Sequence, residues 1–129
     1  MTGQQDAVLA ANQAFYRAFE KRDMAAMSQV WSKGIGTLCI HPGRTALIGW
    51  EAVRNSWEAI LKNTAYIEIE PEILSVEING DLAYVVLIEN LRQVVGLRQD
   101  RAQSVATNLF ERMGGDWFLV HHHGSPLMR

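Results

Sequence analysis

The chain has 129 residues, of which 48% are hydrophobic and 20% charged, and its formal net charge is −2. This length and composition predict one globular domain over residues 1–129 that can bury a core. The small net charge argues against nucleic acid or an anionic membrane as a partner, and no run of about 20 apolar residues suggests a membrane span. With Cys39 alone and no signal-peptide pattern at the start, the sequence predicts a cytoplasmic protein.

The first half of the chain has mainly helical patterning. Residues 6–22 carry apolar side chains three and four positions apart, which is typical of an amphipathic helix. Asp23 can cap a second helix over residues 23–32. Glycines and a proline bound a short strand within residues 34–43, and residues 49–63 return to helical spacing. We therefore expect two helices, a strand and a third helix in this part of the chain.

The second half changes to a period of two, which indicates strands. Residues 66–80 alternate in two phases, and we expect a bulge or bend where Pro71 separates them. Asn79-Gly80 predicts a hairpin turn. Three further strands are predicted within residues 81–91, 104–113 and 117–123. The order helix, helix, strand, helix and four strands predicts an α+β domain.

Some of these strands lack the alternation of a sheet that has one face in water. Residues 82–88 are apolar at successive positions, as are much of 105–110 and the run 117–120. Continuous apolar strands are typical of sheets that are buried on both faces. Three short helices can cover one face, so we expect a second copy of the chain to cover the other. The sequence thus predicts a homodimer through the outer sheet face.

Four segments carry a resemblance to a known family: "HPG" at 41–43, "GWEAVRNSW" at 49–57, "ATNLF" at 106–110 and "GGDWFLVHHHGSP" at 114–126. From about residue 6 to Pro126 the chain resembles the SnoaL-like branch of the nuclear-transport-factor-2-like (NTF2-like) superfamily. The last segment is also similar to the final strand of the association domain of calmodulin-dependent kinases. The resemblance implies a cystatin-like α+β roll, in which three N-terminal helices pack on a curved mixed or antiparallel sheet. Such a cone has a pocket at its open end.

The resemblance does not select one activity. The superfamily includes ketosteroid isomerases, dehydratases, polyketide cyclases, epoxide hydrolases and scaffolds without chemistry, and one fold can host all of these. Catalysis of the ketosteroid-isomerase type requires a pocket aspartate as base. Asp81, Asp100 and Asp116 all lie in predicted turns or hairpin tips. The sequence therefore disfavours a steroid isomerase that works by this mechanism.

Three consecutive histidines, His121, His122 and His123, end the last apolar run. They continue a strand and do not end the chain, which argues against a purification tag. On a strand His121 and His123 share one face and His122 lies on the other, so at most two of them can join one metal site. His41 or Glu89 would have to supply a third ligand. We predict neither a metal nor a cofactor.

The resemblance to the kinase association domain also implies which side chains face the cone. The inward set would be Phe118, Val120, His122 and Gly124, with Asn108 on the neighbouring strand. The set toward the partner subunit would be Trp117, Leu119, His121 and His123. A bulge in this strand would reverse the assignments, because it shifts the alternation by one residue.

Three of these polar residues are candidate catalytic groups. His122 has an ordinary pKa near 6.5 and can exchange protons at neutral pH, while Asn108 can bind a carbonyl or a developing oxyanion. His41 follows the first predicted strand, at a position suited to the pocket rim. For each histidine the alternative is a structural hydrogen bond. Cys39 shares a strand with His41, and we interpret it as an inert small hydrophobe.

Glu89 interrupts an otherwise apolar strand, where a carboxylate needs a partner or a raised pKa. Pairing with Arg92 or a histidine is the favoured interpretation, and a role as base is the alternative. Aromatic side chains are expected to line the apolar part of the cone. The predicted ligand-binding set is Trp31, Trp57, Tyr16, Phe19 and Phe118.

Two functions follow from these residues. One is a cofactor-free isomerase, cyclase or dehydratase that acts on a small, mostly apolar molecule through histidine acid–base chemistry. The other is a non-catalytic homodimeric domain that binds a ligand or serves as a scaffold.

Overall fold

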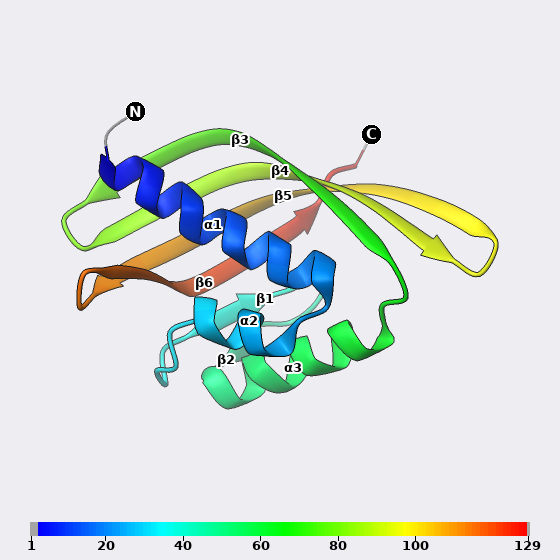
Figure 1. Cartoon of the computed structure of the whole chain (residues 1–129), viewed down its shortest axis with the longest axis horizontal. Coiled ribbons are helices and arrows are strands. Elements are labelled where there is room, and N and C mark those ends of the chain that lie inside the picture. Colours follow the sequence, from blue (N-terminus) through cyan, green and yellow to red (C-terminus); the bar gives the residue numbers. More distant parts are fainter. Residues whose placement is uncertain (1–2, 129) are drawn as a thin grey trace.

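A six-stranded sheet forms the body of the molecule, and the computed structural model describes residues 3–128 of the chain. The strands are β1 (Leu38–Ile40), β2 (Leu47–Ile48), β3 (Ile67–Asn79), β4 (Leu82–Val95), β5 (Arg98–Met113) and β6 (Asp116–Pro126). They lie in the order β2-β1-β6-β5-β4-β3. β1 runs parallel to β6 and every other pair is antiparallel. Figure 1 shows the long strands curving together across the molecule.

Three helices accompany the sheet: α1 (Gly3–Lys21), α2 (Met24–Val30) and α3 (Trp50–Asn63). α1 lies across the sheet, while α2 and α3 gather at the end that holds β1 and β2 (Figure 1). Asp23 caps α2 as its sequence position predicts, because its Oδ1 accepts a hydrogen bond from the backbone N–H of Ala26 at 3.0 Å.

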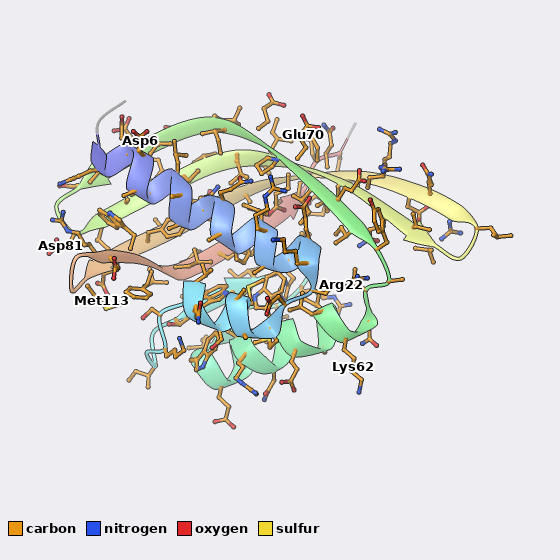
Figure 2. The ribbon with its side chains drawn as sticks, viewed as in Figure 1. Asp6, Arg22, Lys62, Glu70, Asp81 and Met113 are labelled. Atoms are coloured by element: carbon orange, nitrogen blue, oxygen red, sulfur yellow. The ribbon has the colours of Figure 1, made fainter. Side chains whose placement is uncertain are left out.

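The core lies between these helices and the inner face of the sheet. Phe15 of α1 is fully buried and meets Trp57 of α3 edge to face, with ring centroids 5.3 Å apart. Leu87 and Phe110 of the central strands are also fully buried. Lys62 of α3 points away from the helical layer (Figure 2). The helices thus cover one face of the sheet.

The α+β cone and the order of its main elements are confirmed. Two local features differ from expectation. The two-residue strand β2 was not predicted, and it pairs antiparallel with β1. β3 runs through Pro71 without interruption, and its register shifts between Ile73 and Ser75 instead. Pro71 is tolerated there because β3 is the edge strand of the sheet.

A bulge in β6 changes the phase of that strand. His121 pairs with Leu109, but the neighbouring Phe110 pairs with Leu119, so Val120 has no partner on β5. Before the bulge the odd-numbered Trp117 and Leu119 face inward and are buried in the core. After it the even-numbered His122 and Gly124 face inward. The predicted inward orientation of Phe118 and Val120, and the outward orientation of Trp117 and Leu119, are therefore wrong. The inward orientation of His122 and Gly124 agrees with the prediction.

The outer sheet face carries half-buried apolar side chains. They form cross-strand rows, since Ile88 pairs with Val105 and Val86 with Thr107. Tyr84 and His121 flank Leu109 on the same face. The predicted homodimer through this face remains a prediction.

Within the described part of the chain no helix has the length and apolar content to cross a membrane. The predicted cytoplasmic location stays a prediction.

Candidate functional site

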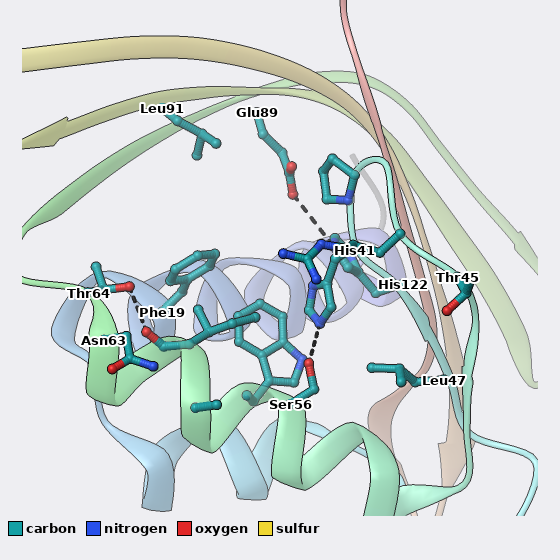
Figure 3. Close-up of a pocket in the computed structure, with 15 residues that line it drawn as sticks. Phe19, His41, Thr45, Leu47, Ser56, Asn63, Thr64, Glu89, Leu91 and His122 are labelled. Carbon is teal, nitrogen blue, oxygen red and sulfur yellow. Dashed lines mark hydrogen bonds and ion pairs between the residues drawn. The ribbon is translucent and has the colours of Figure 1, made fainter.

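A pocket with a volume of about 650 Å³ opens between α3, the inner face of the sheet and the segment that joins β1 to β2. This volume lies in the range typical of small-molecule sites. Its apolar lining includes Phe19, Leu47, Trp57, Ile60 and Leu91. Its polar lining includes His41, Arg44, Ser56, Glu89 and His122. Figure 3 shows Glu89 and His122 meeting at one side of the pocket and His41 meeting Ser56 at another.

Glu89 is the carboxyl group of this pocket. β4 places it inward, and only 6% of the residue is exposed. The Tyr16 hydroxyl donates a hydrogen bond of 2.6 Å to its Oε2. Burial raises the pKa of Glu89 above its ordinary value, and the hydrogen bond from Tyr16 offsets part of this rise. Among residues 3–128 no group donates a hydrogen bond to Oε1, so this oxygen is available to a ligand.

A chain of buried hydrogen bonds fixes the tautomer of His122. Asn108 uses its Nδ2 to donate to Asn12 Oδ1 at 2.8 Å and to the Tyr16 hydroxyl oxygen at 3.1 Å. Its Oδ1 must therefore accept from His122 Nδ1–H, 2.5 Å away. This arrangement leaves His122 Nε2 with a free lone pair, 3.9 Å from Glu89 Oε2.

His122 is consequently neutral at physiological pH. Complete burial lowers its pKa to about 3, and the charges of His41, His121 and His123 act in the same direction. Neutral His122 can accept a hydrogen bond through Nε2, but it is too weak a base to remove protons from carbon at pH 7.

His41 and Ser56 form a second polar pair at the pocket. His41 Nε2 lies 2.6 Å from Ser56 Oγ, and the imidazole ring packs against Trp57. Burial lowers the pKa of His41, and the charge of Arg44 lowers it further. Either Ser56 donates to His41 and the Nδ1–H of His41 faces Cys39 Sγ at 4.0 Å, or His41 donates to Ser56 and the hydroxyl proton of Ser56 is free. In the second state the Ser56 hydroxyl can donate a hydrogen bond to a ligand oxygen.

Cys39 lies close to this pair without the properties of a nucleophile. Its Sγ is 3.7 Å from His41 Nε2 and the residue is fully buried. Burial raises the pKa of Cys39 to about 12, so it remains a thiol at neutral pH. This agrees with its interpretation as a small hydrophobe.

A tight turn carries His41 and Arg44 to the pocket. The backbone N–H of Arg44 donates to the carbonyl of His41 at 2.9 Å, with Pro42 and Gly43 between them. Gly43 has φ +74°, and this sequence is typical of a type II turn. The turn packs against β6, because a Cβ on Gly124 would lie 3.0 Å from Pro42 Cγ.

The predicted site residues fall into two groups. Four of them line the pocket: His41, His122, Phe19 and Trp57. The other four do not reach it: Asn108, Tyr16, Trp31 and Phe118. Asn108 and Tyr16 lie behind the wall and hold His122 and Glu89, Trp31 is buried in the core, and the β6 bulge turns Phe118 outward. The second group therefore does not line this pocket, and a direct ligand contact for these residues stays a prediction.

Ser56 and Arg44 are among the pocket residues that were missed, and the role of Glu89 was undervalued. Ser56 is spaced four and seven residues before Ile60 and Asn63 on α3, and all three line the pocket. Arg44 directly follows the "HPG" segment that was noted. Of the two partners expected for Glu89, Arg92 pairs with Glu68 instead. The proximity of Glu89 to a histidine agrees with the expectation.

Within residues 3–128 no three His, Cys, Asp or Glu side chains come together in a way that could hold a metal ion. His121 and His123 share the outer face, with ring centroids 6.2 Å apart. His41 and Glu89 line the pocket on the inner side, so they cannot complete a site with these two histidines.

The cone, with a pocket between its helices and the inner sheet face, is that of the NTF2-like, cystatin-like class. The chain belongs to the SnoaL-like domain family, whose model matches residues 8–129.

Similar solved structures include a candidate dehydratase of the NTF2-like family from Streptomyces avermitilis, with 30% identity and a TM-score of 0.90. The match covers 96% of each chain. A candidate calcium/calmodulin-dependent protein kinase type II association domain from Thiobacillus denitrificans has 30% identity and a TM-score of 0.85, and the match covers 93% of this chain and 94% of that one. The F-box protein SKIP8 of Arabidopsis thaliana is 25% identical over 95% of this chain. The chain spans about half the length of that curated relative.

Proposed function

We propose that the pocket catalyses cofactor-free proton transfer on a small, mostly apolar carbonyl compound, with Glu89 as the group that moves the proton. The main support is that the Glu89 carboxyl is buried in a largely apolar cavity, has a raised pKa and keeps one oxygen free. A general base is most effective when its pKa approaches the working pH, and desolvation moves Glu89 in that direction.

Each group of the pocket has a part in such a reaction. Glu89 Oε1 removes a proton from the carbon next to the carbonyl and later returns it, so that no proton is gained or lost in an isomerisation. The donor of the His41–Ser56 pair stabilises the negative charge that develops on the carbonyl oxygen. The lone pair of His122 Nε2 accepts a hydrogen bond from a substrate hydroxyl or from protonated Glu89. In a dehydration, protonated Glu89 would give its proton to the departing hydroxide.

This assignment changes the roles that the sequence suggests. His122 was the predicted proton-transfer residue, but a pKa of about 3 makes it a weak base. Asn108 was the predicted oxyanion donor, but both Nδ2 hydrogens have acceptors within the fold. The similarity to a candidate dehydratase supports chemistry of this kind in the pocket.

The Glu89→Gln variant tests the proposal, because Gln keeps the shape and can still accept a hydrogen bond from Tyr16. A panel of 3-oxo and β,γ-unsaturated carbonyl compounds would be incubated in D2O and followed by proton NMR for exchange and isomerisation. We expect the wild-type protein to accelerate at least one compound and the variant to be about 100-fold slower or worse. Glu72→Gln, a change at an exposed position of β3, is the matched control.

Two results would contradict the proposal. One is that the wild-type protein accelerates no compound of the panel, which would favour ligand binding without turnover. The other is that Glu89→Gln retains full activity.

We also propose that two copies of the chain associate through the outer sheet face. The rows of apolar side chains on β4, β5 and β6 support this, because no helix of the described chain packs on that face. The similarity to a candidate kinase association domain supports self-association as well. The pocket lies on the inner side of the sheet and would remain accessible in such a dimer.

A further inference from the structure

The pocket wall holds an unpaired permanent cation, Arg44. Within residues 3–128 no carboxylate forms an ion pair with its guanidinium. The positive charge of Arg44 lowers the pKa of His41, because it disfavours the protonated imidazole. The other arginines near carboxylates behave differently, since Arg92 pairs with Glu68 and Arg112 with Asp81. An unpaired guanidinium beside a largely apolar cavity is suited to an incoming anion.

The other ionisable groups that line the pocket do not pair with Arg44. His41 and His122 are neutral, since burial lowers both pKa values. Glu89 contacts Tyr16 and His122, and it forms no ion pair with Arg44. The guanidinium is therefore not ion-paired inside the pocket, and a ligand that brings a negative group would pair with it.

Three local features hold Arg44 at this position. Pro42 fixes one backbone angle of the turn and Gly43 supplies the positive φ that the next position requires. The absence of a side chain on Gly124 lets Pro42 approach β6 closely. The Arg44 backbone is thus set by the same turn that places His41 against Ser56.

We infer that the pocket selects small apolar carboxylic acids, with the carboxylate bound by Arg44 and the apolar body packed against Phe19, Trp57 and Leu91. This inference rests on the proposed function of the same pocket and names its substrate class. A guanidinium can bind both carboxylate oxygens at once, and a neutral amide of the same shape cannot reproduce that interaction. Arg44 is then the specificity-determining residue, and Glu89 acts on carbon atoms nearby.

A pair of matched probes tests the inference without a known substrate. 4-Phenylbutyrate and the neutral 4-phenylbutyramide have the same carbon skeleton, and their binding would be followed by the change in tryptophan fluorescence, since Trp57 lines the pocket. We expect the acid to bind the wild-type protein at least about 10-fold more tightly than the amide, which corresponds to about 1.4 kcal/mol. Arg44→Gln should reduce this preference to less than about 2-fold while leaving the affinity for the amide unchanged.

Arg98→Gln is the control for net charge, because Arg98 lies in the exposed β4–β5 hairpin and pairs with Asp100. It should keep the full preference for the acid. The inference is overturned if the wild-type protein binds acid and amide equally, if Arg44→Gln keeps the preference, or if the acid shows no binding up to about 10 mM. Glu89→Gln should still prefer the acid, so failure of this inference is distinguishable from failure of the proton-transfer proposal.

Discussion

Burial moves the pKa values of Glu89 and His122 in opposite directions, although their side chains are 3.9 Å apart. Desolvation disfavours whichever form is charged, which is the deprotonated acid and the protonated base. The two groups therefore resist becoming an ion pair. The hydrogen bond that Tyr16 donates to Glu89 opposes the rise in the pKa of the acid, whereas Asn108 accepts a hydrogen bond from His122 and holds its proton on Nδ1.

The first prediction concerns the effect of His122 on the stability of the protein at low pH. Its pKa in the folded protein, about 3, is below the ordinary value of 6.5, so the unfolded chain binds the proton more readily. The folded protein is therefore most stable, with respect to this residue, above pH 6.5, and it loses free energy of unfolding as the pH falls toward 3. In denaturant titrations the free energy of unfolding should decrease over this window, with a slope of at most about 1.4 kcal/mol per pH unit from this residue.

His122→Asn isolates this contribution, because its side-chain amide can still donate to Asn108 but does not titrate. The difference between the two proteins should shrink as the pH falls from 6.5. A difference that is independent of pH would mean that His122 titrates normally in the folded protein.

The second prediction concerns Tyr16. Its hydroxyl donates to Glu89 and thereby holds the pKa of Glu89 below the value that burial alone would give. Tyr16→Phe should therefore shift the midpoint of the pH dependence of kcat/KM to higher pH. It should also destabilise the protein by about 1 kcal/mol, as expected for a lost buried hydrogen bond. A midpoint that stays in place or moves to lower pH would contradict the assigned direction of the hydrogen bond.

At the scale of elements, the turn between β1 and β2 and the bulge in β6 decide what faces the pocket. Gly43 in the turn has φ +74° and Gly96 in the β4–β5 hairpin has φ +64°, and an added Cβ would meet no atom within 4 Å at either position. The two glycines therefore differ in location and not in local strain.

This comparison gives the third prediction. Gly43→Ala and Gly96→Ala should each cost about 1 kcal/mol of stability in thermal or chemical unfolding, because alanine is strained at positive φ. Only Gly43→Ala should also weaken 4-phenylbutyrate binding, since it alone disturbs the turn that carries Arg44. Equal binding by the two variants would show that the turn does not set the pocket.

The sequence predicted the elements well and the phase of β6 in part. The apolar spacing of α1 and α3, the Asp23 cap and the Asn79-Gly80 turn are local signals, and each gave the observed element. The bulge at Val120 depends on pairing with β5, so the run "WFLVHHH" shows no local sign of it. That is why His122 was placed correctly and Phe118 was not.

The candidate site was less predictable for the same reason. Glu89 was noticeable as a carboxylate in an apolar strand, but its approach to Tyr16 joins positions 73 residues apart. Ser56 and His41 are 15 residues apart in the chain, and no local sequence pattern indicates that they form a pair. Contacts of this kind follow from the closure of the whole cone.

At the scale of the whole molecule, the helices cover the inner sheet face and leave the outer face to a proposed partner copy. The fourth prediction is that Val86→Asp dissociates the dimer, because it would bury a charge at the centre of the apolar rows. Sedimentation analysis should show a dimer for the wild-type chain and at least about a 10-fold weaker association for the variant.

Leu97→Asp, in the exposed tip of the β4–β5 hairpin, is the matched control and should remain dimeric. A wild-type chain that stays monomeric at high concentration, or a variant that dimerises normally, would contradict the proposed interface.

The proposed reaction depends most on the ionisation of Glu89, which can be followed directly by carbon NMR of the labelled side-chain carboxyl over a pH titration. We expect the pKa of Glu89 to lie above the ordinary value of 4.5 and to match the midpoint of the pH dependence of kcat/KM. A carboxyl that titrates at or below 4.5, or activity that changes at an unrelated pH, would contradict the proposed reaction.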